Sequence, residues 1–325
     1  MLVRRAFPVV VGIGLLGLMG AAAAQQPIAI ATPPAGSVYN SSGSAIAKVL
    51  ADKGLKVTIQ AFGGSSQYLP AINAGELEFG IANVYETALA VQGQDYFKGR
   101  PTTNVRTVAT IFPLRNSIFV RKDSPFKNVA DLKGKRGPTG FTSQRVLVAV
   151  TNAVLGTAGL TLEKDIQGVN VANIIGNTDA FTANRTDFFV FALGAAKVKE
   201  VDAAVGGVRA LPIPNTPDAI AGMRKHVPGA FLRREVPNPV STGIMEPTYQ
   251  VAYGVNVFAS TKTSNDLVYK MVEAIHANAK ELGQAVGVLR LLDPNGMAVV
   301  IPGVEYHPGA IEFYKKIGQW PPKTL

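Results

Sequence analysis

The 325-residue sequence contains no cysteine. This absence excludes disulfide bonds, a thiol nucleophile and a thiolate metal site, and it leaves no cysteine for a membrane-tethering lipid. Histidine is scarce too, with three residues spread widely along the chain. The G-x-S-x-G, Walker and H-E-x-x-H motifs and zinc-ligand spacings are all missing. We therefore expect no metal, no cofactor and no catalytic residues, although sequence alone leaves open a carboxylate pair in an exported hydrolase.

A concentrated basic surface is also lacking. The chain has 32 basic and 22 acidic residues, a net charge of +10. The basic residues are dispersed and do not form the stripe, interleaved with aromatic residues, that nucleic-acid binders carry. We therefore expect no nucleic-acid partner. The positive charge favours solubility and a mild attraction of anionic ligands toward a cleft.

The first 24 residues have the pattern of a signal peptide. Arg4 and Arg5 precede an uncharged apolar run from Ala6 to Ala24, which ends in four alanines. Such an ending fits an A-x-A cleavage site, so we expect cleavage near Ala24 and a mature protein free in the periplasm. The alternative is a membrane anchor, because the run approaches the roughly 20 residues that span a bilayer.

The remaining chain of about 300 residues exceeds what one hydrophobic core usually serves, so two domains are expected. Strand-like runs alternate with helical stretches throughout, which predicts an α/β fold. A crossing strand is expected at 105–112, and prolines suggest a return crossing at 211–215. The predicted division is a signal peptide (1–24), lobe 1 (25–112), an inserted lobe 2 (113–211), and a return to lobe 1 with C-terminal helices (212–325). Each lobe is expected to be a mixed sheet flanked by helices, with hinge strands joining the two.

Four segments in order carry a family resemblance. They are the Gly/Tyr-rich stretch 36–47, the loop, helix and strand of 64–83, the segment 117–137 with its Asp-Leu-Lys-Gly-Lys run, and the Pro-Gly motif of 301–310. Segment 117–137 resembles the entry into the second lobe of bacterial periplasmic solute-binding proteins. Together the four resemble the TAXI-type binding proteins of TRAP transporters. The resemblance implies a type II-like periplasmic-binding-protein clamp, monomeric, that captures a small organic anion for fused TRAP membrane subunits.

The resemblance implies a carboxylate or a glutamate-like amino acid as ligand, but the chain departs from the family where ligand contacts are expected. Tyr39-Asn40 replaces the usual Tyr-Pro pair, and Gly194-Ala195-Ala196 replaces polar residues after the aromatic strand. The identity of the ligand therefore stays open. So does an ABC-type binding protein for sulfonate, nitrate or thiamine precursors, a class that shares the Asp-Leu-Lys-Gly-Lys run but not the terminal Pro-Gly motif.

Three groups of polar residues lie at expected helix starts facing one cleft. They are Ser41 and Ser42, then Ser65, Ser66 and Gln67, then Thr139, Thr142 and Ser143 from the other lobe. Several donors converging on a closed cleft suit a carboxylate, which accepts several hydrogen bonds. Taken singly, each Ser or Thr also fits a simple helix cap.

Further candidates surround this cleft. Arg115 follows the crossing strand and could pair bidentately with a ligand carboxylate, or else form a surface ion pair. Asn83 could contact a polar ligand group or merely end its strand. Four aromatic residues could wall the cleft or pack in the core: Tyr39, Phe112, Phe191 and Tyr249.

Overall fold

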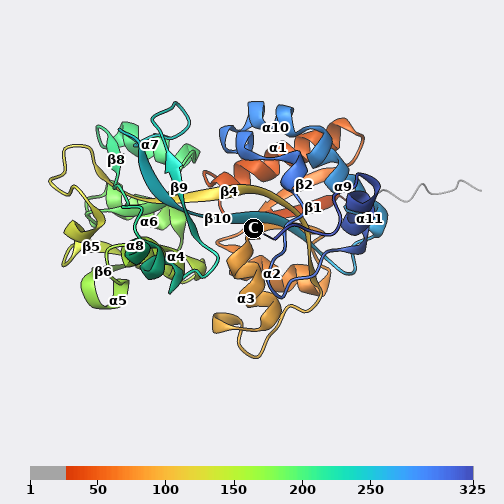
Figure 1. Cartoon of the computed structure of the whole chain (residues 1–325), viewed down its shortest axis with the longest axis horizontal. Coiled ribbons are helices and arrows are strands. Elements are labelled where there is room, and N and C mark those ends of the chain that lie inside the picture. The colour runs from red at the N-terminus through yellow and green to blue at the C-terminus, as the bar shows by residue number, and fades with distance from the viewer. Residues whose placement is uncertain (1–26, 325) are drawn as a thin grey trace, which may run out of the picture.

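The computed structural model describes residues 27–324 and shows two lobes side by side (Figure 1). The predicted signal peptide lies outside the described residues. Between residues 27 and 324, no helix has the length and apolarity needed to cross a membrane.

Lobe 1 is built on three parallel strands with helices on both faces (Figure 1). Its strands are β1 (Ile28–Thr32), β2 (Val57–Ala61) and β3 (Phe79–Asn83). Its helices are α1 (Val38–Asp52), α2 (Ser65–Ala74), α3 (Val84–Gln92), α9 (Asn265–Ala277), α10 (Ala279–Ala285) and α11 (Pro308–Lys316), with 3-10 turns η1 (Asp95–Phe97), η3 (Gly287–Leu291) and η4 (Pro294–Gly296).

Lobe 2 has five shorter strands. They are β5 (Arg136–Gly140), β6 (Gln167–Val171), β7 (Phe189–Ala192), β8 (Val208–Ala210) and β9 (Phe231–Glu235). Its helices are α4 (Val146–Gly156), α5 (Leu162–Asp165), α6 (Ile174–Thr182), α7 (Ala196–Ala204) and α8 (Pro217–Arg224), with the 3-10 turn η2 (Val129–Leu132). Strands β5 and β6 form a separate parallel pair.

Two long antiparallel strands, β4 (Val105–Arg121) and β10 (Thr248–Ser260), run through both lobes. The main sheet has the order β2-β1-β3-β10-β4-β7, with β8 added to β4 and β9 added to β10. The crossing strand expected at 105–112 is therefore part of a longer continuous strand that ends at Arg121. Register shifts interrupt the β4–β10 pairing between Val255 and Asn256 and between Val257 and Phe258.

We propose that the chain returns to lobe 1 later than residue 212, the boundary expected from the sequence. Helix α8 packs against α4 of lobe 2, so closely that a Cβ on Gly222 would lie 1.9 Å from the carbonyl oxygen of Gly156. Strand β9 pairs with the first half of β10. The prolines near residue 212 belong to the approach to α8, which Thr216 caps with Pro217 in its first turn. We therefore propose that the return crossing is β10.

Helix α1 begins at Val38 and so includes most of the Gly/Tyr-rich stretch 36–47. Ser37 caps it by accepting a hydrogen bond from the Asn40 N–H. The Gly- and Ser-rich sequence resembles a loop, but Gly43 faces β1, where a Cβ would lie 2.9 Å from the Thr32 methyl group. Packing against the sheet thus overrides the low helix propensity of this segment.

Candidate functional site

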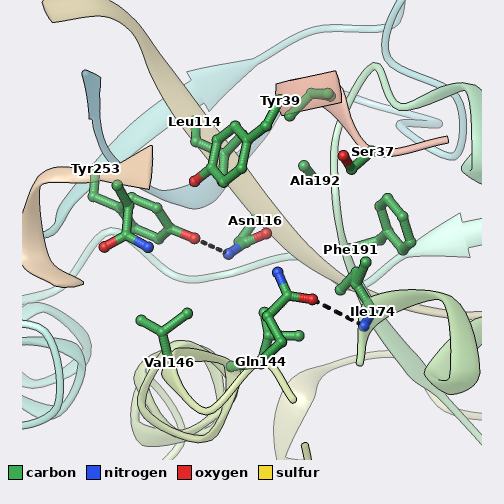
Figure 2. Close-up of a pocket in the computed structure, with 13 residues that line it drawn as sticks. Ser37, Tyr39, Leu114, Asn116, Gln144, Val146, Ile174, Phe191, Ala192 and Tyr253 are labelled. Atoms are coloured by element: carbon green, nitrogen blue, oxygen red, sulfur yellow. Dashed lines mark hydrogen bonds between the residues drawn. The ribbon is translucent and has the colours of Figure 1, made fainter. Parts of the chain in front are cut away.

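A cavity lies between the lobes, where β4 and β10 pass from one to the other (Figure 2). Its volume is about 40 Å³, well below the roughly 300–1,000 Å³ typical of small-molecule sites. Residues from both lobes and both long strands line it: Ser37, Val38, Tyr39, Asn83, Leu114, Asn116, Gln144, Val146, Leu147, Ile174, Phe191, Ala192 and Tyr253. We call it the central cavity.

Four helices begin at the central cavity. Helices α1 and α3 follow the carboxyl ends of β1 and β3, and their caps Ser37 and Asn83 line the wall, as do the first residues of α4 and α6. The first N–H groups of a helix have no intrahelical partner, and its N-terminus carries a partial positive charge. The crevice at the carboxyl ends of strands is also where open α/β sheets bind ligands. The cavity is therefore donor-rich and weakly positive.

The polar side chains of the central cavity hold one another in place (Figure 2). The Asn116 amide donates a hydrogen bond to the Tyr253 hydroxyl, which keeps its own proton free to donate. The Gln144 carbonyl oxygen accepts the Ile174 N–H at 3.1 Å, so the Gln144 NH₂ group is turned toward Asn116. Burial raises the pKa of Tyr39 and of Tyr253, so both phenols stay neutral donors.

None of the 13 residues that line the central cavity is charged. Side chains alternate along a strand, so Leu114 and Asn116 of β4 face the cavity while Arg115 faces away. The buried Arg115 guanidinium lies 3.5 Å from the Glu235 carboxylate and 3.5 Å from the Leu193 carbonyl oxygen. Burial lowers the pKa of Arg115, and the charge of Glu235 opposes that shift.

One carboxyl group is buried beside the central cavity. Glu86 of α3 is fully buried and accepts hydrogen bonds from the hydroxyls of Ser65 and Tyr96. Among the described residues it has no ion-pair partner within 4 Å. Burial raises the pKa of Glu86 to about 7, although its two hydrogen bonds lower it. Its charge also contributes to the raised pKa of Tyr39 and Tyr253, so it lies within electrostatic reach of the cavity wall.

A second, wider cavity opens beside the first and has a volume of about 330 Å³. Four predicted site residues line it: Ser66, Gln67, Thr142 and Ser143. Arg100 and Arg145 come from opposite lobes to the same cavity, and the Arg145 guanidinium lies over the Tyr96 ring, 5.3 Å from its centroid.

The two lobes touch between the two cavities. A Cβ on Gly64 would lie 2.4 Å from the Ser143 carbonyl oxygen and 2.7 Å from Gln144 Cα. The Ser66 hydroxyl donates a hydrogen bond to that same Ser143 oxygen at 3.4 Å. On the other side of α1, the Lys197 N–H donates to the Gly36 carbonyl at 3.3 Å. The structure therefore has the lobes in direct contact.

The remaining predicted residues lie outside both cavities. Three serines turn into the protein: Ser41 bonds the Ser37 carbonyl one turn back, Ser42 is buried in α1, and Ser65 bonds Glu86. Phe112 is packed in the core, Thr139 bonds Asn170 on β6, and Tyr249 lies in the part of β10 paired with β9. Of the candidates, Tyr39, Asn83 and Phe191 line the central cavity.

Sequence reasoning missed Asn116, Gln144 and Tyr253. Asn116 was open to detection, because it is an amide within a strand rich in apolar residues, and a buried amide needs a partner. Gln144 stands two residues before the first residue of the apolar helix α4, so the sequence alone indicates only that it belongs to the approach to that helix. The sequence around Tyr253 gives no sign of a binding role, because its place in the cavity wall depends on the pairing of β10 with β4.

A family comparison accounts for nearly the whole described chain. The model of the NMT1-like family matches residues 30–318. The chain belongs to the NMT1-like family. Three solved structures resemble this NMT1-like protein. The first, described as a periplasmic transporter, has a TM-score of 0.57 at 16% identity and covers 92% of this chain and 95% of its own.

The second is a protein from Bordetella bronchiseptica RB50, with a TM-score of 0.53 at 18% identity, covering 90% of this chain and 98% of its own. The third is the periplasmic aliphatic sulphonate binding protein SsuA from Escherichia coli, with a TM-score of 0.50 at 17% identity, covering 92% and 93%. These likenesses confirm the expected fold of the NMT1-like protein, the two-lobed α/β clamp of periplasmic binding proteins.

Proposed function

We propose that this NMT1-like protein is a periplasmic solute-binding protein, which captures a small solute between its lobes and delivers it to a membrane transporter. The observation that carries the proposal is the central cavity, whose wall combines both lobes and both strands that join them. A solute held there contacts both lobes, so its binding energy favours the closed arrangement. The absence of charged groups from the wall also suits binding better than acid–base catalysis.

We further propose that the transporter is of the TRAP type, a secondary transporter with fused small and large membrane subunits, and that the binding protein acts as a monomer. Support comes from the four sequence segments that resemble TAXI-type proteins, nearly all within the residues that the family model matches. The Arg4–Ala24 segment supports export to the periplasm. An ABC-type partner is the alternative. Uptake by reconstituted subunits separates the two, because only the TRAP type works from an ion gradient without ATP.

Solute binding is tested on the mature chain, residues 25–325, after unfolding and refolding to remove any bound molecule. A thermal-shift screen with carboxylates, amino acids and sulfonates is expected to give at least one probe that raises the melting temperature, because a ligand specific for the folded state stabilises it. Calorimetry then gives its Kd.

Asn116→Ala removes the group that holds Tyr253 and should weaken binding of that probe about 5- to 150-fold, since a lost buried hydrogen bond costs about 1–3 kcal/mol. Thr139→Ala, outside both cavities, is the matched control and should bind as the parent does. A folded protein that no probe stabilises, or undiminished binding by Asn116→Ala, would contradict solute capture in the central cavity.

A further inference from the structure

The division of polarity within the central cavity restricts the solute. Lobe 1 contributes three polar residues and one apolar residue to the wall: Ser37, Tyr39, Asn83 and Val38. Lobe 2 contributes five apolar residues and one polar residue: Val146, Leu147, Ile174, Phe191, Ala192 and Gln144. One end of a bound solute therefore meets donors, and the other end meets hydrocarbon.

We infer that the solute is a small monoanion, with one carboxylate toward lobe 1 and an apolar body toward lobe 2, and that dicarboxylates and amino acids are excluded. The inference rests on the proposed function and concerns the same cavity. It departs from the dicarboxylate or glutamate-like ligand that the family resemblance implies.

The negative charge of a single carboxylate can be balanced in the central cavity without a cationic side chain. The N-termini of α1 and α3 each carry about half a positive charge, which together offset one negative charge. The hydroxyls of Tyr39 and Tyr253 and the NH₂ of Gln144 add neutral donors around it. Neutral donors and helix ends of this kind bind anions in many proteins.

A second carboxylate has no partner in the apolar half. It would lie against side chains such as Leu147 and Phe191, which are almost completely buried, and burying an unpaired charge is strongly unfavourable. The nearest candidate cation on the long strands, Arg115, points away and is already paired with Glu235.

A solute ammonium is equally unmatched. No carboxylate lines the cavity, and Glu86, although within electrostatic reach of its wall, is already bonded to Ser65 and Tyr96. The positive ends of α1 and α3 would also repel an ammonium at the polar end. An α-amino acid would therefore lose affinity relative to the acid of the same shape that lacks the amino group.

Three probes of similar size separate these cases by calorimetry on the refolded mature protein. 4-Methyl-2-oxopentanoate is the monoanion, 2-oxoglutarate adds a second carboxylate, and L-leucine adds an ammonium. We expect the monoanion to bind at least 100-fold more tightly than either of the others. Tighter binding of 2-oxoglutarate, L-leucine or L-glutamate would overturn the monoanion inference and leave solute capture standing. Failure of all the probes and of the wider screen would overturn solute capture itself.

A variant tests the reason for the preference. Leu147→Lys places a cation at the apolar end and should improve binding of 2-oxoglutarate relative to the monoanion by at least tenfold. Val148→Lys is the matched control, because Val148 is the next residue of α4 and does not line the cavity. Equal preferences in Leu147→Lys and Val148→Lys, with both folded by circular dichroism, would contradict the assignment of the apolar end. The comparison of the three probes on the parent protein stands whether or not the variant folds.

Discussion

Glu86→Gln tests the buried carboxyl group beside the central cavity. The pKa of Glu86 is raised by burial from 4.5 to about 7, so the folded protein holds the proton more tightly than the unfolded chain does. The stability that the protonated group provides is fully present below pH 4.5 and is lost as the pH rises through about 7. A shift of about 2.5 units at 1.36 kcal/mol per unit corresponds to about 3 kcal/mol.

The assay is urea unfolding of the mature protein at pH 4 and pH 9. Between these values the parent should lose about 3 kcal/mol more of its unfolding free energy than Glu86→Gln, whose amide does not ionise. Gln can still bond both Ser65 and Tyr96, because each hydroxyl can accept as well as donate. Glu312→Gln, at an exposed site on α11, controls for the loss of one acidic residue. Parallel pH profiles for the parent and Glu86→Gln would refute the reasoning.

Two glycine substitutions test lobe contact and packing. Gly64→Ala puts a methyl group 2.4 Å from the Ser143 carbonyl oxygen, so it should keep the lobes apart. We expect it to weaken solute binding at least tenfold and to give a wider molecule in small-angle scattering. Unchanged affinity would show that closure tolerates the methyl group. Gly222→Ala forces α8 away from Gly156 and should cost about 2 kcal/mol of unfolding free energy, by overpacking. Gly229→Ala, with open space around its Cβ, is the control, and equal losses in both variants would contradict the packing argument.

The fold could be predicted from local patterns because most strands and helices carry their own signals. Residues 265–282 carry an amphipathic stripe that is typical of a helix, and the structure has α9 and α10 there, interrupted at Asn278. Helix and strand boundaries that depend on tertiary packing were harder to predict from the sequence. The start of α1 is an example, because Ser37 caps a helix whose glycine is explained only by its contact with Thr32.

The site was less predictable than the fold. Arg115 and Asn116 are neighbours on β4, so their side chains lie on opposite faces of the strand. Which face of β4 meets the cavity therefore decides whether a cation or an amide lines it. Tyr39 and Phe191 could be identified from the sequence as candidates for the cavity wall, because they are aromatic residues near the ends of helices or strands. Their meeting with Tyr253 is a property of the assembled sheet, in which residues more than 200 positions apart come together.

The continuous course of β4 and β10 has a mechanical consequence. The lobes are joined by a hydrogen-bonded two-stranded ribbon instead of a flexible linker, so any movement of one lobe against the other has to twist that ribbon. The register shifts next to Val255 and Val257 are the irregular points of the ribbon, and bulges of this kind increase local twist. We therefore expect the paired strands to resist twisting, and this resistance to limit how far one lobe can open against the other.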